Sequence, residues 1–165
     1  MKNTWLYCFL FSCCSCVPSW AQVNSDACGP LSNGVGPFDY RTERGNVLYL
    51  VESTHFLPEV EAVVRGHTSG TPGGDIDYTL RAFPNHHRAL ISMMRLGEKE
   101  KTPKPYGSRF TVECWFDRAI RFRNDDTTVR MIFSTYLVKN NRTQDAVAHL
   151  EQATTLAKDN PFTQY

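Results

Sequence analysis

Histidine is the residue type in this chain with the widest chemical range, because it can bind a metal or transfer a proton near neutral pH. The chain has five histidines, and His86 and His87 are adjacent in the segment PNHHRAL. His55 lies earlier, with Glu59 four residues after it. These groups could form a metal site or the centre of a small exported hydrolase, which is the alternative function considered below.

The spacing of these histidines argues against that alternative. Outside the predicted signal peptide, where Cys13 and Cys16 happen to have CxxC spacing, the sequence contains neither an HExxH pair nor a CxxC pair, which are common signatures of zinc sites. Adjacent side chains on a helix point about 100° apart, so His86 and His87 would rarely bind one metal ion together. We therefore expect no metal, no cofactor and no catalytic residue. The two histidines are interpreted as packing near the first turn of a helix capped by Asn85.

The six cysteines are the second candidate for chemistry, and their distribution is uneven. Four of them lie near the start of the chain, and only Cys28 and Cys114 follow. In an exported protein these two would form a disulfide, worth about 4–5 kcal/mol in the chain-entropy model because it closes a long loop. The alternative is a pair of buried free thiols.

Residues 1–21 have the layout of a secretory signal peptide. Lys2 precedes an apolar run of about 13 residues, which is too short to span a bilayer, and a small-residue cleavage site ends at Ala21. Cleavage there predicts a periplasmic or secreted protein without a stable membrane span. A lipoprotein anchor at Cys13 is the weaker alternative, because the residues before it fit a lipobox poorly.

Composition and charge exclude two classes of protein. With 41% hydrophobic and 21% charged residues, the chain has the composition of a globular protein and not of a disordered one. Its 18 Lys and Arg residues are balanced by 17 Asp and Glu residues. Nucleic-acid binders usually carry a basic excess, so we expect no nucleic-acid partner.

The first part of the chain is expected to be irregular and only partly helical. This region, residues 22–83, is rich in glycine and proline, with a short helix predicted to begin near Pro58. Residues 66–77 have the composition of a loop, and residues 78–83 could be either a strand or an extended linker.

The second part of the chain, residues 84–160, has apolar residues at helical spacing. One helix is predicted to begin after Asn85, a second to run from about 108 to 122, and a third from 127 to 139. Thr143 is predicted to cap a fourth helix. The fold class that follows is mainly α, with antiparallel helical hairpins after an irregular N-terminal region.

A repeat strengthens this prediction. When the chain is shifted by 34 residues, Phe116 and Ala119 align with Leu150 and Ala153. The segment 127–160 then forms one helix–turn–helix unit that resembles the tetratricopeptide (TPR) repeat, which implies a short solenoid. A looser unit precedes it and carries a proline-rich insertion. The small residues that let paired helices approach closely are Ser134, Ala146 and Ala153. An ordinary helical hairpin is the alternative.

Three phrases of the N-terminal half also resemble a known group of proteins. They read CGPLSNGVGPFDYR, VESTHF and DYTLRAFPNHHRAL. They are similar to the opening of a mostly uncharacterised family of exported bacterial proteins that carry TPR units downstream. The resemblance covers Cys28 to about Tyr165 and implies an exported helical interaction module. It brings no established catalytic residues.

We therefore expect a periplasmic or secreted protein–protein interaction module, an accessory of an envelope assembly that binds another protein or a peptide. A purely structural subunit fits equally well. The first helices of TPR units line the concave surface of a solenoid. On that basis the candidate binding residues, expected to be exposed, are Arg130, Ser134, Lys139 and Asn141.

The end of the chain adds one expectation about partners. Residues 161–165 lie where a further repeat would begin. Either the sequence is shortened relative to its relatives, or the apolar face of the last hairpin is covered by a partner or by self-association with a second copy. The residues of that face are Ala146, Val147, Leu150 and Ala153.

Overall fold

The computed structural model describes residues 28–158, and in this part of the chain it has seven helices and no strand. A mainly α fold is therefore confirmed there. The predicted signal peptide (1–21) and residues 161–165 lie outside the described residues. The helices are α1 (Asn46–His55), α2 (Pro58–Glu61), α3 (Pro72–Ala82), α4 (His87–Glu100), α5 (Val112–Phe122), α6 (Thr127–Lys139) and α7 (Thr143–Lys158).

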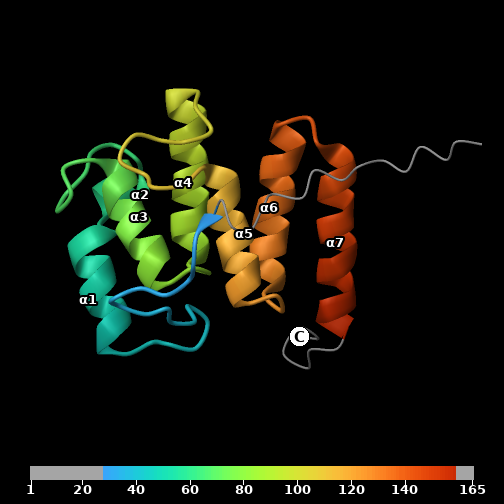
Figure 1. The fold of residues 1–165 in the computed structure, drawn as a ribbon, viewed down its shortest axis with the longest axis horizontal. Coiled ribbons are helices and arrows are strands. Elements are labelled where there is room, and N and C mark those ends of the chain that lie inside the picture. Colours follow the sequence, from blue (N-terminus) through green and yellow to red (C-terminus); the bar gives the residue numbers. More distant parts are fainter. Residues whose placement is uncertain (1–27, 159–165) are drawn as a thin grey trace, which may run out of the picture.

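The helices lie in a row along the longest axis of the molecule, from α1 at the left to α7 at the right (Figure 1). Contacts link α1 with α3, α3 with α4, α4 with both α5 and α6, and α6 with α7. The larger apolar core extends from α2 to α7 and includes the buried Trp115 and Phe116 of α5. A second, smaller cluster packs α1 on the end of α3 and consists of Leu48, Val51, Ala82 and Phe83. Within residues 28–158, no helix is long and apolar enough to cross a membrane.

The second half of the chain follows the predicted helices closely, but α3 lies where a loop and an extended stretch were expected. Thr71 caps α3 by accepting a hydrogen bond from the backbone N–H of Gly74 (3.1 Å), and Pro72 takes the first helical position. A Cβ on Gly73 would lie 2.1 Å from the carbonyl oxygen of Tyr106. Gly73, one of the glycines that suggest a loop, therefore allows α3 to lie close to the loop that contains Tyr106.

Replacing Gly73 by alanine should lower the free energy of unfolding by about 1–3 kcal/mol, because the overlap with a backbone carbonyl outweighs the gain in helix propensity. Gly34→Ala is the matched control, since nothing lies within 4 Å of the added methyl group. Its effect should stay within about 0.5 kcal/mol. Urea unfolding followed by circular dichroism measures both, and equal effects of the two substitutions would contradict the packing role of Gly73.

The hairpins α3–α4 and α5–α6 repeat each other. A shift of 40 residues relates both pairs of helix starts, from 72 to 112 and from 87 to 127. Three details are repeated with the same shift: the first-helix caps Thr71 and Thr111, the ion pairs Asp77–Arg81 and Asp117–Arg121, and the second-helix caps His86 and Asp126. The segment 127–160, predicted as the best repeat unit, corresponds to α6 and α7 up to Lys158.

Residues 28–45 form an irregular stretch before α1, which we call the N-terminal segment. This segment is linked covalently and by hydrogen bonds to the row of helices. Cys28 forms the predicted disulfide with Cys114 of α5, at a sequence separation of 86 residues. The buried guanidinium of Arg118, also on α5, donates hydrogen bonds to the carbonyl oxygens of Cys28 and Pro30, both at 2.8 Å. The start of this segment is therefore fixed on α5.

Candidate functional site

A buried polar junction joins the N-terminal segment to the turns of both hairpins, with Asp39 at its centre. Its carboxylate accepts hydrogen bonds from Arg41 (Nη2 to Oδ2, 2.8 Å), Arg123 after α5 (Nε to Oδ2, 2.7 Å) and Asn85 before α4 (Nδ2 to Oδ1, 2.7 Å). Burial by itself would raise the pKa of Asp39, but these hydrogen bonds outweigh it and hold the pKa well below its ordinary value. The carboxylate is therefore ionised and engaged by its neighbours.

Asn85 connects Asp39 to a second buried carboxylate, that of Asp126. Its Nδ2 donates to Oδ2 of Asp126 (2.9 Å), and its Oδ1 accepts from the backbone N–H of Tyr40 (3.0 Å). Asp126 in turn caps α6. The prediction that Asn85 caps α4 is wrong, because the side chain of His86 does so. Asn85 instead links the two hairpin turns.

The role of His86 follows from the partners of its two ring nitrogens. Nδ1 accepts from the backbone N–H of Ala89 (3.2 Å), so Nε2 carries the proton that is donated to Oε1 of Glu52 (3.0 Å). The ring is buried and stacks on Tyr40, with ring centres 4.0 Å apart. Burial lowers the pKa of His86, and Glu52 opposes this only in part. The neutral ring thus uses both nitrogens in structural bonds and has no lone pair left for a metal or a substrate.

The other two histidines of the alternative site have their own carboxylate partners. Nε2 of His87 lies 2.9 Å from Oδ2 of Asp126, and Nδ1 of His55 lies 3.0 Å from Oδ1 of Asp75. His55, His86 and His87 therefore pair with three different carboxylates and are not brought together as one site. Among residues 28–158, no group of three or more His, Cys, Asp or Glu side chains could hold a metal ion.

Two of the four predicted binding residues are not exposed. Arg130 is buried, and its Nε and Nη2 donate to the carbonyl oxygen of Asn124 (3.1 and 2.9 Å) while its Nη1 donates to Gln152 of α7. Ser134 lies one turn further along the same face and is also buried. The expected exposure of Arg130 and Ser134 is wrong because α6 packs on α7 as well as on the core.

The other two predicted residues, Lys139 and Asn141, are exposed beside the turn between α6 and α7. Nζ of Lys139 lies 2.7 Å from Oε1 of Glu98 on α4, and Asn141 has a left-handed conformation (φ 61°), which asparagine tolerates at the end of a helix. Glu98 also lines a crevice between the ends of α4 and α6, together with Met94 and Tyr136. A binding role for Lys139 and Asn141 stays a prediction.

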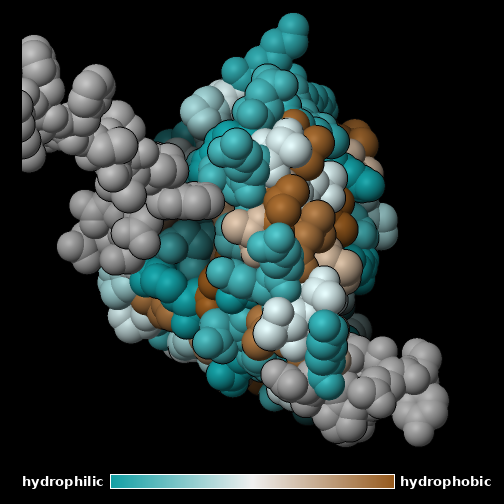
Figure 2. All heavy atoms as spheres, turned by 90° about the vertical axis from the view of Figure 1, so that its right-hand side faces the viewer, coloured by the Kyte–Doolittle hydropathy of each residue, from teal (hydrophilic) through white to brown (hydrophobic). Residues whose placement is uncertain are grey.

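Large exposed apolar side chains mark the last hairpin. On α6 these are Met131 (49% exposed) and Val138 (53%), and on α7 they are Val147 (46%) and Leu150 (43%). Figure 2 shows apolar side chains gathered on this end of the molecule, bordered by polar ones. The four residues form the candidate binding surface of the protein.

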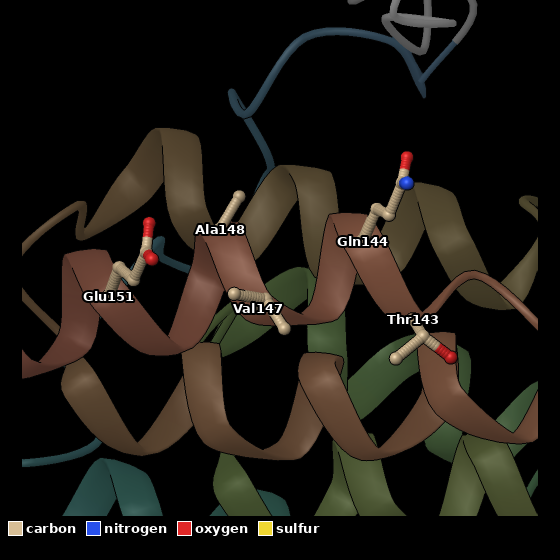
Figure 3. A pocket seen from close by; sticks show the side chains of 5 residues that line it. All are labelled: Thr143, Gln144, Val147, Ala148 and Glu151. Carbon is tan, nitrogen blue, oxygen red and sulfur yellow. The ribbon is translucent and has the colours of Figure 1, made fainter.

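The sequence predicts half of this surface. Of the face expected to need a cover, Ala146 and Ala153 are buried, whereas Val147 and Leu150 are exposed. Figure 3 shows Val147 in a shallow hollow of α7 whose other lining residues are Thr143, Gln144, Ala148 and Glu151. Met131 and Val138 lie outside the apolar stripe of α6. Their only signal in the sequence is that they are apolar and seven residues apart, which places them on one face.

These features define a mainly helical protein whose paired helices expose an apolar surface at one end and whose N-terminal segment is held by a buried polar junction. Comparisons with protein-family models, with curated proteins and with solved structures return no match for this chain.

Proposed function

We propose that this chain is an exported protein–protein interaction module of the TPR type that acts as an accessory of a cell-envelope assembly. The observation that carries the proposal is the exposure of four large apolar side chains on the last hairpin, namely Met131, Val138, Val147 and Leu150. Apolar residues gathered on a surface and bordered by polar ones are typical of protein-binding sites. The polar groups of the junction, by contrast, are engaged with one another.

Two observations support the TPR type. The bounds of α6 and α7 agree with the repeat unit expected over residues 127–160 as far as the chain is described. The small residues Ala146 and Ala153 are buried in this hairpin, as expected where two helices approach closely.

The disulfide supports export, because disulfides persist mainly in oxidising compartments outside the cytosol. A periplasmic or secreted location is proposed from this bond together with the predicted signal peptide, which lies outside the described residues.

A capture experiment tests the module. The tagged full chain is incubated with envelope extract, and the proteins retained by wild type, Val138→Glu and Val64→Glu are quantified. Val64 is the matched control, since it is exposed (69%) but lies in the turn after α2, away from the last hairpin. Recovery of the partner should fall at least about tenfold for Val138→Glu, because a charge would be buried without a counter-ion. Equal recovery with all three chains would contradict the proposal.

A further inference from the structure

We propose that the outer face of α7 binds an amphipathic helix of a partner protein. This helix packs on α7 in the way that α6 packs on α5. The face consists of Val147 and Leu150 with Thr143 and Thr154, which recur at intervals of three and four residues and so share one side of the helix. This inference rests on the proposed function and specifies the kind of partner.

The internal repeats show that the residues equivalent to Leu150 in the preceding helices are buried. The 40-residue shift places Ile76 of α3 on Phe116 of α5, and the 34-residue shift places Phe116 on Leu150 of α7. Ile76 and Phe116 are fully buried, whereas Leu150 is 43% exposed. Helix α3 is followed in the chain by α4, and α5 is followed by α6. In both cases the second helix packs on the first. In α7, no helix within residues 28–158 buries the equivalent residue Leu150 in this way.

The contacts of Phe116 describe the side chains that such a helix would bring. Its ring stacks on Phe133 of α6 with ring centres 4.8 Å apart, and it lies 5.7 Å from the ring of Tyr136. Phe133 and Tyr136 are three residues apart, so they lie on one face of α6. The helix that fits α7 therefore carries two large apolar or aromatic side chains one turn apart.

The charge beside the face adds a second requirement. Glu151 borders the hollow around Val147, is exposed, and forms no ion pair with any of residues 28–158. A basic side chain next to the apolar pair of the partner helix would complement it. The stated partner is thus an amphipathic helix with two large apolar residues one turn apart and an adjacent Lys or Arg. This is the helix-in-groove mode of recognition.

A peptide copied from α6 provides the probe, because α6 is the helix seen against the equivalent face of α5. A fluorescent peptide spanning residues 126–141 is titrated with the full chain and with the variants Leu150→Glu and Leu50→Glu. Leu50 is the matched control, being an exposed leucine (64%) on α1 at the other end of the row. We expect at least tenfold weaker binding to Leu150→Glu and unchanged binding to Leu50→Glu. A peptide with Phe133→Ala and Tyr136→Ala should bind at least tenfold more weakly than the parent.

Several results would overturn the inference. Equal binding of the peptide to wild type and Leu150→Glu would do so, as would an absence of binding to wild type. If wild type without peptide forms a dimer that Leu150→Glu abolishes, the occupant is a second copy and not a partner helix. Capture of an envelope protein that depends on Val138 but not on Leu150 would contradict binding at the outer face of α7. The proposed function would still hold in that case. Circular dichroism of each variant verifies that it is folded.

Discussion

Replacing both Cys28 and Cys114 by alanine should lower the free energy of unfolding by about 4–5 kcal/mol. The bond joins residues 86 positions apart, so its loss releases a long loop in the unfolded chain. Alanine is chosen because both sites are buried, and a serine hydroxyl would add the cost of an unsatisfied polar group. This loss is a large share of the 5–15 kcal/mol that stabilises an ordinary domain.

Urea unfolding of the oxidised wild type, the reduced wild type and the double variant measures the effect. Reduction and substitution should give similar losses, because both remove the same constraint. A loss below about 1 kcal/mol would show that the unfolded chain gains little freedom. In a chain without residues 1–21, where Cys28 and Cys114 are the two cysteines, two titratable thiols in the native oxidised protein would contradict the bond itself.

Asp39→Asn should lower the free energy of unfolding at pH 7 by about 1.5–3 kcal/mol, the range for hydrogen bonds to a charged group, because Asp39 is buried whereas Arg41 and Arg123 are partly exposed. Asparagine keeps the shape of the side chain but loses the charge that faces Arg41 and Arg123. The matched control is Asp117→Asn, whose carboxylate forms an i,i+4 pair with Arg121 nearer the surface. That substitution should cost no more than about 1 kcal/mol.

The effect of Asp39→Asn should depend on pH in a defined direction. Despite burial, hydrogen bonds hold the pKa of Asp39 below its ordinary value, so the unfolded state takes up protons first as the pH falls. The stabilisation is therefore complete above about pH 5 and is lost as the pH decreases further through the ordinary pKa of Asp. Urea unfolding at pH 7 and pH 3 should show a smaller drop for Asp39→Asn than for wild type. Parallel losses in the two proteins would contradict an ionised Asp39 in the native state.

The parts of the fold that sequence predicts best are those fixed by local rules. The bounds of α6 agree with the prediction, because its apolar spacing is regular and Asn141 can adopt the left-handed conformation that ends the helix. Helix α3 is the opposite case. Its glycines are poor helix formers, and the contact of Gly73 with Tyr106 that requires one of them joins residues far apart in the sequence.

The candidate site shows the same limit. Arg130 has the sequence pattern of an exposed binding residue, yet the packing of α7 covers it. The sequence indicates His86 as a candidate for the alternative site and Asn85 as a helix cap, but their partners Glu52 and Asp39 lie in the separate phrases VESTHF and GPFDYR. The third of the phrases that resemble the exported family, which contains Asn85 and His86, is thus hydrogen-bonded to each of the other two. Sequence alone shows their presence but not this pairing.

The way the N-terminal segment is fastened has a consequence for folding. In a simple repeat array each unit contacts only its neighbours, so folding can spread from any point and the ends can melt separately. Here Cys28 is bonded to α5, and Asp39 bridges the turns before α4 and after α5. These long-range links cannot form until both hairpins are in place. We expect α3 to α6 to fold and unfold as one cooperative unit, more slowly than a purely local helical array of the same size.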